Sequence, residues 1–123
     1  MDDLLIDLKI DIFQRAKLFI DDMGLFAPFG SKLKNGEIKA VVIMDEKEDI
    51  LKILEMLKRN FSEEIPNKGV QAGAIAYDIT VSLEDGRKTD ALCLLLSVDG
   101  VNWSEDHHPY HIVNEECVWG IEP

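Results

Sequence analysis

The sequence has few cysteines, little positive charge and no long apolar run. Two of its 123 residues are cysteine, and 24 aspartates and glutamates outnumber 13 lysines and arginines, so the formal net charge is 13 − 24 = −11. This excess of negative charge opposes binding to DNA or RNA, because the phosphates repel the chain. No apolar stretch approaches the roughly 20 residues of a membrane-spanning helix. We therefore expect neither a nucleic-acid-binding protein nor a membrane protein.

The two cysteines are too few and too far apart for a disulfide framework or a zinc knuckle. Cys93 lies inside an apolar run, which is typical of a buried free thiol. Neither Cys93 nor Cys117 has a second cysteine two or three residues away, as a zinc knuckle requires. The segment Met1-Asp2-Asp3 also lacks the basic residues that begin a secretion signal. We expect a cytoplasmic protein in which both thiols stay reduced.

Motifs of known catalytic and phosphate-binding sites are missing as well. The chain contains no Gly-Lys-Ser or Gly-Lys-Thr phosphate loop, no Gly-x-Ser-x-Gly nucleophile turn and no His-Glu-x-x-His zinc motif. The motifs therefore imply no cofactor and assign no catalytic residue. A length of 123 residues, of which 46% are apolar and 30% charged, suits one globular domain over residues 1–123.

Two segments have the apolar spacing of amphipathic helices. Apolar residues recur three and four positions apart over residues 2–23, and Gly24 follows as a natural helix stop. The same spacing over residues 46–65 predicts a second helix, with Asp45 or Glu46 as its N-cap. Each helix therefore has one apolar face with which it packs on a core.

Turn sequences predict two β-hairpins and one further strand. Asn35-Gly36 favours a two-residue turn, because both residues tolerate the positive φ angles of a type I′ turn. Asp85-Gly86 favours a second hairpin between residues 70–81 and 88–98, and a last strand is expected within residues 108–119. The predicted fold class is α+β, with two layers, two helices and a mainly antiparallel five-stranded sheet in the order α-β-β-α-β-β-β.

The second hairpin is predicted to have two unlike faces. A two-residue turn at Asp85-Gly86 pairs Tyr77 with Leu94 and places both on a face of bulky side chains. The opposite face then carries small side chains, among them the strip Ala72-Ala74-Ala76. We expect a helix to cover this strip. Without such a helix the strip is a ligand groove or a self-association surface, so a homodimer stays open as an alternative.

Four residues around the small face are candidates for a ligand pocket. Asp78 interrupts a central apolar strand and faces Cys93 in the predicted register. A buried carboxylate without a partner is costly, so Asp78 needs hydrogen bonds or solvent. One hypothesis makes Asp78 and Asp90 structural. The other places Asp78, Asp90, Cys93 and Tyr110 around a pocket, where raised carboxyl pKa values would suit acid–base chemistry.

The three histidines, His107, His108 and His111, lie within five residues and suggest a metal site at first sight. In an extended strand His107 and His111 stand about 13 Å apart. That is too far for one zinc ion, whose ligand nitrogens each lie about 2 Å from it. Pro109 opposes a helix that would bring them together. We expect a solvated loop leading into a strand and no metal site. A metal site formed by the three histidines is the alternative.

Three short segments resemble a family of small bacterial proteins of uncharacterised function. They are Phe26-Ala27-Pro28-Phe29-Gly30 ahead of the first hairpin, Thr89-Asp90-Ala91 at the start of an apolar strand, and Pro109-Tyr110 in the last strand. The resemblance spans most of the chain, from Phe26 to Tyr110. It implies a compact bacterial cytosolic domain and brings no activity, cofactor or catalytic residue with it. It also marks Asp90 and Tyr110 as positions to inspect.

Charge and the missing motifs together favour a non-enzymatic, acidic protein-binding module. Acidic runs at residues 45–49, Glu63-Glu64 and Glu115-Glu116 are either solvated surface or a means of steering a basic protein partner. A toxin-neutralising immunity protein is one concrete version of this hypothesis. The alternative is a small-molecule-binding protein or enzyme with a pocket on the small-residue face of the central strands.

Overall fold

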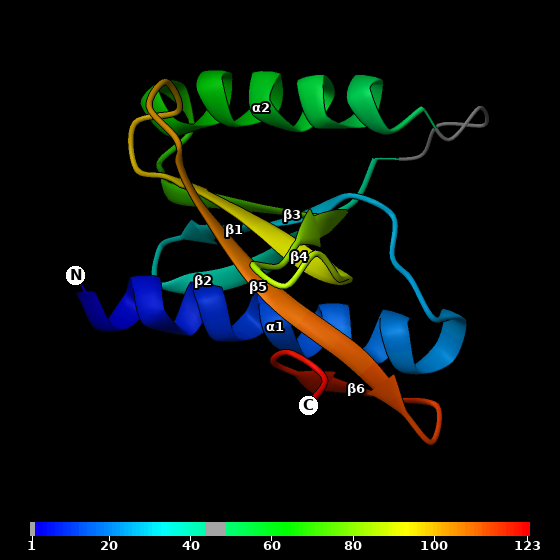
Figure 1. Ribbon diagram of the computed structural model, residues 1–123. Coiled ribbons are helices and arrows are strands. Elements are labelled where there is room, and N and C mark those ends of the chain that lie inside the picture. The colour runs from blue at the N-terminus through cyan, green and yellow to red at the C-terminus, as the bar shows by residue number, and fades with distance from the viewer. Residues whose placement is uncertain (1, 44–48) are drawn as a thin grey trace.

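The computed structural model describes residues 2–43 and 49–123, which form two helices and one six-stranded sheet (Figure 1). Along the chain the elements are α1 (Asp2–Met23), β1 (Phe29–Lys34), β2 (Glu37–Val41), α2 (Ile50–Asn67), β3 (Val70–Ser82), β4 (Lys88–Ser97), β5 (Ser104–Val113) and β6 (Glu116–Trp119). The predicted α+β class and the two helices are confirmed. The sheet has six strands rather than five, because the segment expected to be one last strand forms the hairpin β5–β6.

The strands lie in the order β2-β1-β3-β4-β5-β6, and every neighbouring pair is antiparallel. The first hairpin has the predicted two-residue turn, in which Lys34 pairs with Glu37. Asn35 and Gly36 have φ angles of 54° and 77°, as a type I′ turn requires. Asn114, with a φ angle of 52°, begins the corresponding two-residue turn of the hairpin that the prediction missed.

The two helices lie on opposite faces of the sheet, so the domain has three layers rather than the predicted two (Figure 1). On one face, the α1 side, α1 packs against β1, β3 and β6. On the other face, the α2 side, α2 packs against β3. The central strands are apolar on both faces, and each face needs its own cover. In the described ranges neither helix combines the length and the apolar character needed to cross a membrane.

The loop between β3 and β4 has three residues instead of the two that we predicted. The Leu83 N–H donates to the Arg87 carbonyl at 2.7 Å and closes the loop. Gly86, the third loop residue, has a φ angle of 87°, as expected for the left-handed residue that follows a type I turn in such hairpins. The extra loop residue moves the β4 register by one position, and a shift of one turns every β4 side chain to the other face.

The predicted division into a bulky face and a small face is therefore wrong. Tyr77 pairs with Cys93, and Leu94 pairs with Ala76 on the opposite face. Each face combines the large side chains of one strand with the small side chains of its neighbour. On the α1 side, leucines of β4 lie beside the alanines of β3, and on the α2 side Ile75 lies close to Cys93.

The alanine strip of β3 is covered by α1, as we expected. Ala72, Ala74 and Ala76 are 1%, 0% and 0% exposed, so the strip forms neither an open groove nor a free surface for self-association. The side chains that α1 buries against the sheet lie three or four residues apart and are Leu8, Ile12, Ala16 and Ile20. Gly24 ends the helix as predicted, with a φ angle of 79° and its N–H bonded to the Ile20 carbonyl at 2.7 Å.

α2 begins directly after Asp49, whose side chain accepts a hydrogen bond from the Lys52 N–H at 3.3 Å and caps the helix. The predicted caps, Asp45 and Glu46, lie outside the described residues. The helix continues one residue past Pro66, although we expected it to end before this proline. Pro66 has no N–H to donate to the carbonyl four residues back, so the helix lacks one hydrogen bond just before it ends.

Phe61 of α2 lies in a hollow that two glycines leave on the α2 side of the sheet. A Cβ atom added to Gly73 of β3 would stand 2.5 Å from Cδ1 of Phe61, and one added to Gly30 of β1 would stand 3.4 Å from the same ring. Phe61 is 0% exposed. The missing side chains of these glycines therefore let α2 pack closely on the sheet.

Candidate functional site

Asp78 of β3 and Tyr110 of β5 form a hydrogen-bonded pair on the α1 side. The Tyr110 hydroxyl donates to both carboxylate oxygens of Asp78, at 2.8 Å to Oδ1 and 3.0 Å to Oδ2. The backbone N–H of Phe26, between α1 and β1, donates to the same carboxylate. Asp78 thus has the partners that a carboxylate inside an apolar strand requires.

The surroundings of this pair suit a structural clamp better than an acid–base catalyst. Burial raises the pKa of Asp78 above its usual range; the Tyr110 hydrogen bond opposes the rise, and the charge of Asp90 adds to it. Burial and the bond to Asp78 raise the pKa of Tyr110, so its hydroxyl stays protonated as a donor. Tyr110 is 1% exposed, which keeps it away from a substrate. The clamp joins β3, β5 and the segment before β1.

The four predicted pocket residues do not share one site. Asp78, Asp90 and Tyr110 lie on the α1 side, whereas the β4 register turns Cys93 to the α2 side. Asp90 and Tyr110 help to line an open depression of about 360 Å³, whose lining includes neither Asp78 nor Cys93. The structure therefore offers no common pocket for these four residues.

The three histidines lie in three different environments. His107 is on the α2 side, with Nε2 2.9 Å from Oε2 of Glu105. His108 packs edge-on against an aromatic ring of α1, with ring centroids 4.8 Å apart. His111 places Nδ1 3.0 Å from the backbone carbonyl that follows β6. They do not converge, because His108 points to the face opposite to the other two, and His107 and His111 stand about 13 Å apart along the strand.

One of these histidines instead lies beside a cysteine and a glutamate. The donor atoms of Cys93, Glu105 and His107 all lie within 4.8 Å of one another. Cys93 pairs with His107 across the β4–β5 ladder, so the two side chains share a face. From the sequence we assigned Cys93 and His107 to separate candidate sites, since the register that brings them together depends on the β4–β5 connection, for which we predicted no register.

The end of α1 and the β5–β6 turn enclose a second feature, which we call the acidic corner. It is a depression of about 340 Å³ lined by Ile20, Asp21, Asp22, Gly24, Ile112 and Glu115. Asp21 ties its two walls together, because its Oδ1 accepts a hydrogen bond of 2.6 Å from the backbone N–H of Cys117 in β6. The corner is thus built from the first helix and the last hairpin of the described chain.

Negative charge in the acidic corner is only partly balanced. Lys17 forms an ion pair with Asp21 at 2.9 Å. The Cys117 N–H bond, followed by the Lys17 bond, lowers the pKa of Asp21. Asp22 and Glu115 make no side-chain hydrogen bond or ion pair with any residue that the structure describes. The last turn of α1 also holds no basic residue, although the C-terminal end of a helix dipole is negative and favours cations.

Exposed apolar side chains lie in the lining of the acidic corner and next to it in the sequence. Met23 and Leu25 are each 57% exposed, and Ile112 is 43% exposed. Such side chains offer contact area to the aliphatic stem of a lysine or an arginine. The corner thus combines a hollow, unbalanced carboxylates and an apolar rim.

Comparisons with known proteins gave no match for this chain among family models, curated proteins or solved structures. What the cysteine–glutamate–histidine cluster and the acidic corner can do therefore follows from their geometry. Our sequence analysis singled out the run Glu115-Glu116 and missed Asp21 and Asp22. Two aspartates at the predicted C-terminal end of a helix, where they oppose the dipole, were the signal that could have revealed them.

Proposed function

We propose that the protein is a non-enzymatic protein-binding module, and that its acidic corner receives a basic side chain of the partner. The observation that carries this proposal is the pair Asp22 and Glu115. These exposed carboxylates lie beside the negative end of α1, and no cation from the described residues balances them. A lysine or arginine of a partner supplies that cation.

The shape and the overall charge of the protein support the same proposal. The aliphatic stem of the incoming side chain lies against Ile112, while its charged end meets Asp22 and Glu115. The formal charge of −11 increases the rate at which a basic protein encounters this surface. The same charge opposes a second copy of the chain as the partner.

A toxin-neutralising immunity protein is one concrete form of such a module. Neutralisation by binding needs a stable acidic surface and no catalytic residues, which agrees with the missing catalytic motifs. In this form the basic partner is the toxin, and the module acts by covering its basic surface.

Charge reversal at the corner tests the proposal. The variant Asp22→Lys/Glu115→Lys changes the net charge to −11 + 4 = −7. We expect it to lose at least about 100-fold in affinity for the native partner, because like charges then face each other across the interface. The partner is first isolated from the native cell extract on immobilised wild-type protein at low and moderate salt, and its affinity for each variant is then measured.

The matched control reverses two exposed charges elsewhere. Glu55→Lys/Glu63→Lys on α2 carries the same net charge of −11 + 4 = −7 but leaves the corner intact. This control should keep nearly the wild-type affinity. The proposal fails if no partner is retained at either salt concentration, or if both double variants lose binding equally. In the second case only the net charge would matter.

A further inference from the structure

We propose that Cys93, Glu105 and His107 bind a divalent metal ion of the zinc class on the α2 side of the sheet. The three residues lie on β4 and β5, outside the lining of the acidic corner at the end of α1. This inference therefore adds a second site and does not depend on the proposed protein partner.

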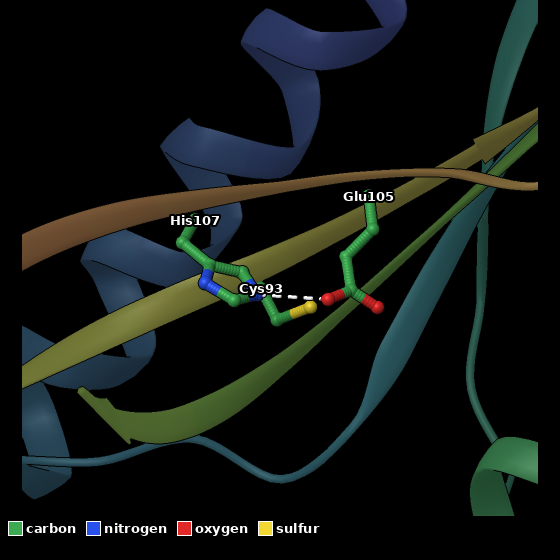
Figure 2. Close-up of side chains that lie close together, drawn as sticks. All are labelled: Cys93, Glu105 and His107. Carbon is green, nitrogen blue, oxygen red and sulfur yellow. Dashed lines mark hydrogen bonds and ion pairs between the residues drawn. The ribbon is translucent and has the colours of Figure 1, made fainter.

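The strand ladder brings the three side chains together. Cys93 of β4 pairs directly with His107 of β5, and Glu105 precedes His107 by two residues, so alternation places all three on one face. Figure 2 shows the thiol, the imidazole ring and the carboxylate pointing toward one another. Nε2 of His107 is 2.9 Å from Oε2 of Glu105, and all three donor atoms lie within 4.8 Å.

These distances are close to those of a tetrahedral zinc site. Zinc lies about 2.3 Å from sulfur and about 2.0–2.1 Å from nitrogen, so its ligand atoms are roughly 3.5 Å apart. Donors as much as 4.8 Å apart need to approach by up to roughly 1.3 Å, and the pair at 2.9 Å needs to separate by roughly 0.6 Å. Glu105 and His107 can make this adjustment, since their side chains are 52% and 45% exposed and can rotate.

The three candidate ligands differ in their exposure to solvent. Cys93 is 0% exposed and forms the floor, while the exposed Glu105 and His107 form the entrance. An ion therefore reaches the thiol only when the exposed side chains of Glu105 and His107 rotate to admit it. Tyr77 pairs with Cys93 across the β3–β4 ladder, so its side chain lies beside the thiol on the same face. Outer contacts of this kind orient metal ligands in known sites.

The donor set selects the class of metal. Thiolate and imidazole suit zinc and similar transition metals, whereas calcium and magnesium take oxygen ligands. The bound thiolate and the carboxylate of Glu105 together carry two negative charges, which balance a divalent ion. Three protein ligands leave a fourth position for water or another small ligand.

A cysteine, a histidine and an acid can also form a hydrolytic triad, in which the histidine activates the thiol. Two properties of Cys93 oppose that role. The residue is 0% exposed, so a substrate cannot reach its sulfur. Burial also raises the pKa of its thiol, whereas nucleophilic cysteines are accessible and have lowered pKa values.

The test is a titration of the reduced full chain with zinc chloride, and in parallel with cobalt(II) as a spectroscopic probe. We expect one zinc per chain with micromolar or tighter affinity and a rise in the melting temperature, because an ion that binds the native state stabilises it. Bound cobalt should show tetrahedral d–d bands and a near-ultraviolet sulfur-to-metal charge-transfer band.

Single variants then identify the ligands. Glu105→Gln and His107→Ala change exposed side chains and should each weaken zinc binding by at least about tenfold. Cys93→Ser should abolish the charge-transfer band. Asp106→Asn is the matched control, because Asp106 is the exposed neighbour of Glu105 and points to the opposite face. This control should bind like the wild type.

Three results would overturn the inference. The first is the absence of stoichiometric zinc binding by the wild-type chain. The second is binding that Glu105→Gln and His107→Ala leave unchanged, which would place the ion elsewhere. The third is a charge-transfer band that persists in Cys93→Ser. If Cys93→Ser fails to fold, the two exposed variants still decide the outcome.

Discussion

At the scale of single residues, Asp78 shows that one polar side chain can hold an apolar strand in place although burial disfavours its charged form. Its hydrogen bonds from Tyr110 and Phe26 connect three segments that are distant in sequence. Its ionised form is nevertheless disfavoured by burial and by the neighbouring charge of Asp90, which together hold its pKa above the usual range. The clamp therefore contains a carboxylate that folding makes harder to ionise.

This raised pKa predicts how the variant Asp78→Asn depends on pH. A group whose pKa is raised by folding contributes stability below its unfolded pKa, and this contribution is lost as pH rises through the folded pKa. Asparagine cannot ionise, so the variant does not lose this stability as the pH rises. The free energy of unfolding of Asp78→Asn, measured relative to wild type by urea denaturation, should therefore increase between about pH 4 and pH 7.

Asp90→Asn provides the control for this prediction. Removing the charge of Asp90 should lower the pKa of Asp78 toward its usual range, so the pH dependence of stability should weaken. A difference between Asp78→Asn and wild type that stays constant across the pH range would contradict the prediction.

From the sequence we grouped Asp78 with Tyr110 as pocket candidates but did not predict the hydrogen bond between them. An aspartate between apolar residues of a central strand is visible in the sequence, and its need for hydrogen bonds follows from elementary energetics. Tyr110 lies two strands away, across β4, and 32 residues along the chain. Its position depends on two strand registers, and an error of one residue in either turns the side chain away.

At the scale of elements, the same kind of turn signal gave one correct register and one wrong one. Asn35-Gly36 forms the two-residue turn that it predicts, with positive φ angles at both residues. Asp85-Gly86 belongs to a three-residue loop, in which only the glycine has a positive φ angle. Asp-Gly is compatible with both loop lengths. The packing of both faces of β4 decides between them, and that packing is not local in sequence.

The hollow beneath Phe61 predicts that a single methyl group in β3 will loosen α2. A Cβ atom at Gly73 would stand 2.5 Å from Cδ1 of Phe61, so Gly73→Ala forces the ring or the helix to move. Overpacking of this kind costs about 1–3 kcal/mol. We expect Gly73→Ala to lower the free energy of unfolding by that amount in urea denaturation.

A second substitution checks the cause of this loss. Phe61→Leu removes the ring that an added methyl group meets. The double variant Gly73→Ala/Phe61→Leu should therefore lose less free energy of unfolding than the two single variants lose together. Strictly additive losses would show that the methyl group acts on the strand alone and not through its contact with α2.

At the scale of the whole molecule, the negative charge acts against the compact state. The formal charge is −11, and mutual repulsion of surface carboxylates is greatest when the chain is folded. Raising sodium chloride from about 0.01 M to about 0.15 M shortens the screening length from about 30 Å to about 8 Å. The melting temperature near pH 7 should therefore rise by a few degrees.

Repeating the measurement near the isoelectric point provides the control. The sequence has a pI of about 4.5, where net repulsion vanishes and added salt should no longer stabilise the fold. A melting temperature that is unchanged or falls with salt near pH 7 would mean that individual ion pairs, such as Lys17 with Asp21, outweigh the net repulsion.

The class and the order of the first six elements could be predicted, whereas the hairpin β5–β6 and the layering were not. Helix spacing over residues 2–23 and the first hairpin are local signals, and both are confirmed. The apolar character of β3 and β4 on both faces already implied a cover on each side. We nevertheless predicted two layers, because the order of the elements is typical of a two-layer α+β domain.

The hydrogen bond between Asp21 and the Cys117 N–H joins residues that are 96 positions apart. During synthesis at about 5–20 residues per second, the end of α1 is made about 5–20 s before β6. Until β6 is made, the apolar stripe of α1 lacks at least one of its three strand contacts. A nascent chain held just short of β6 should therefore be a better chaperone client than the finished protein.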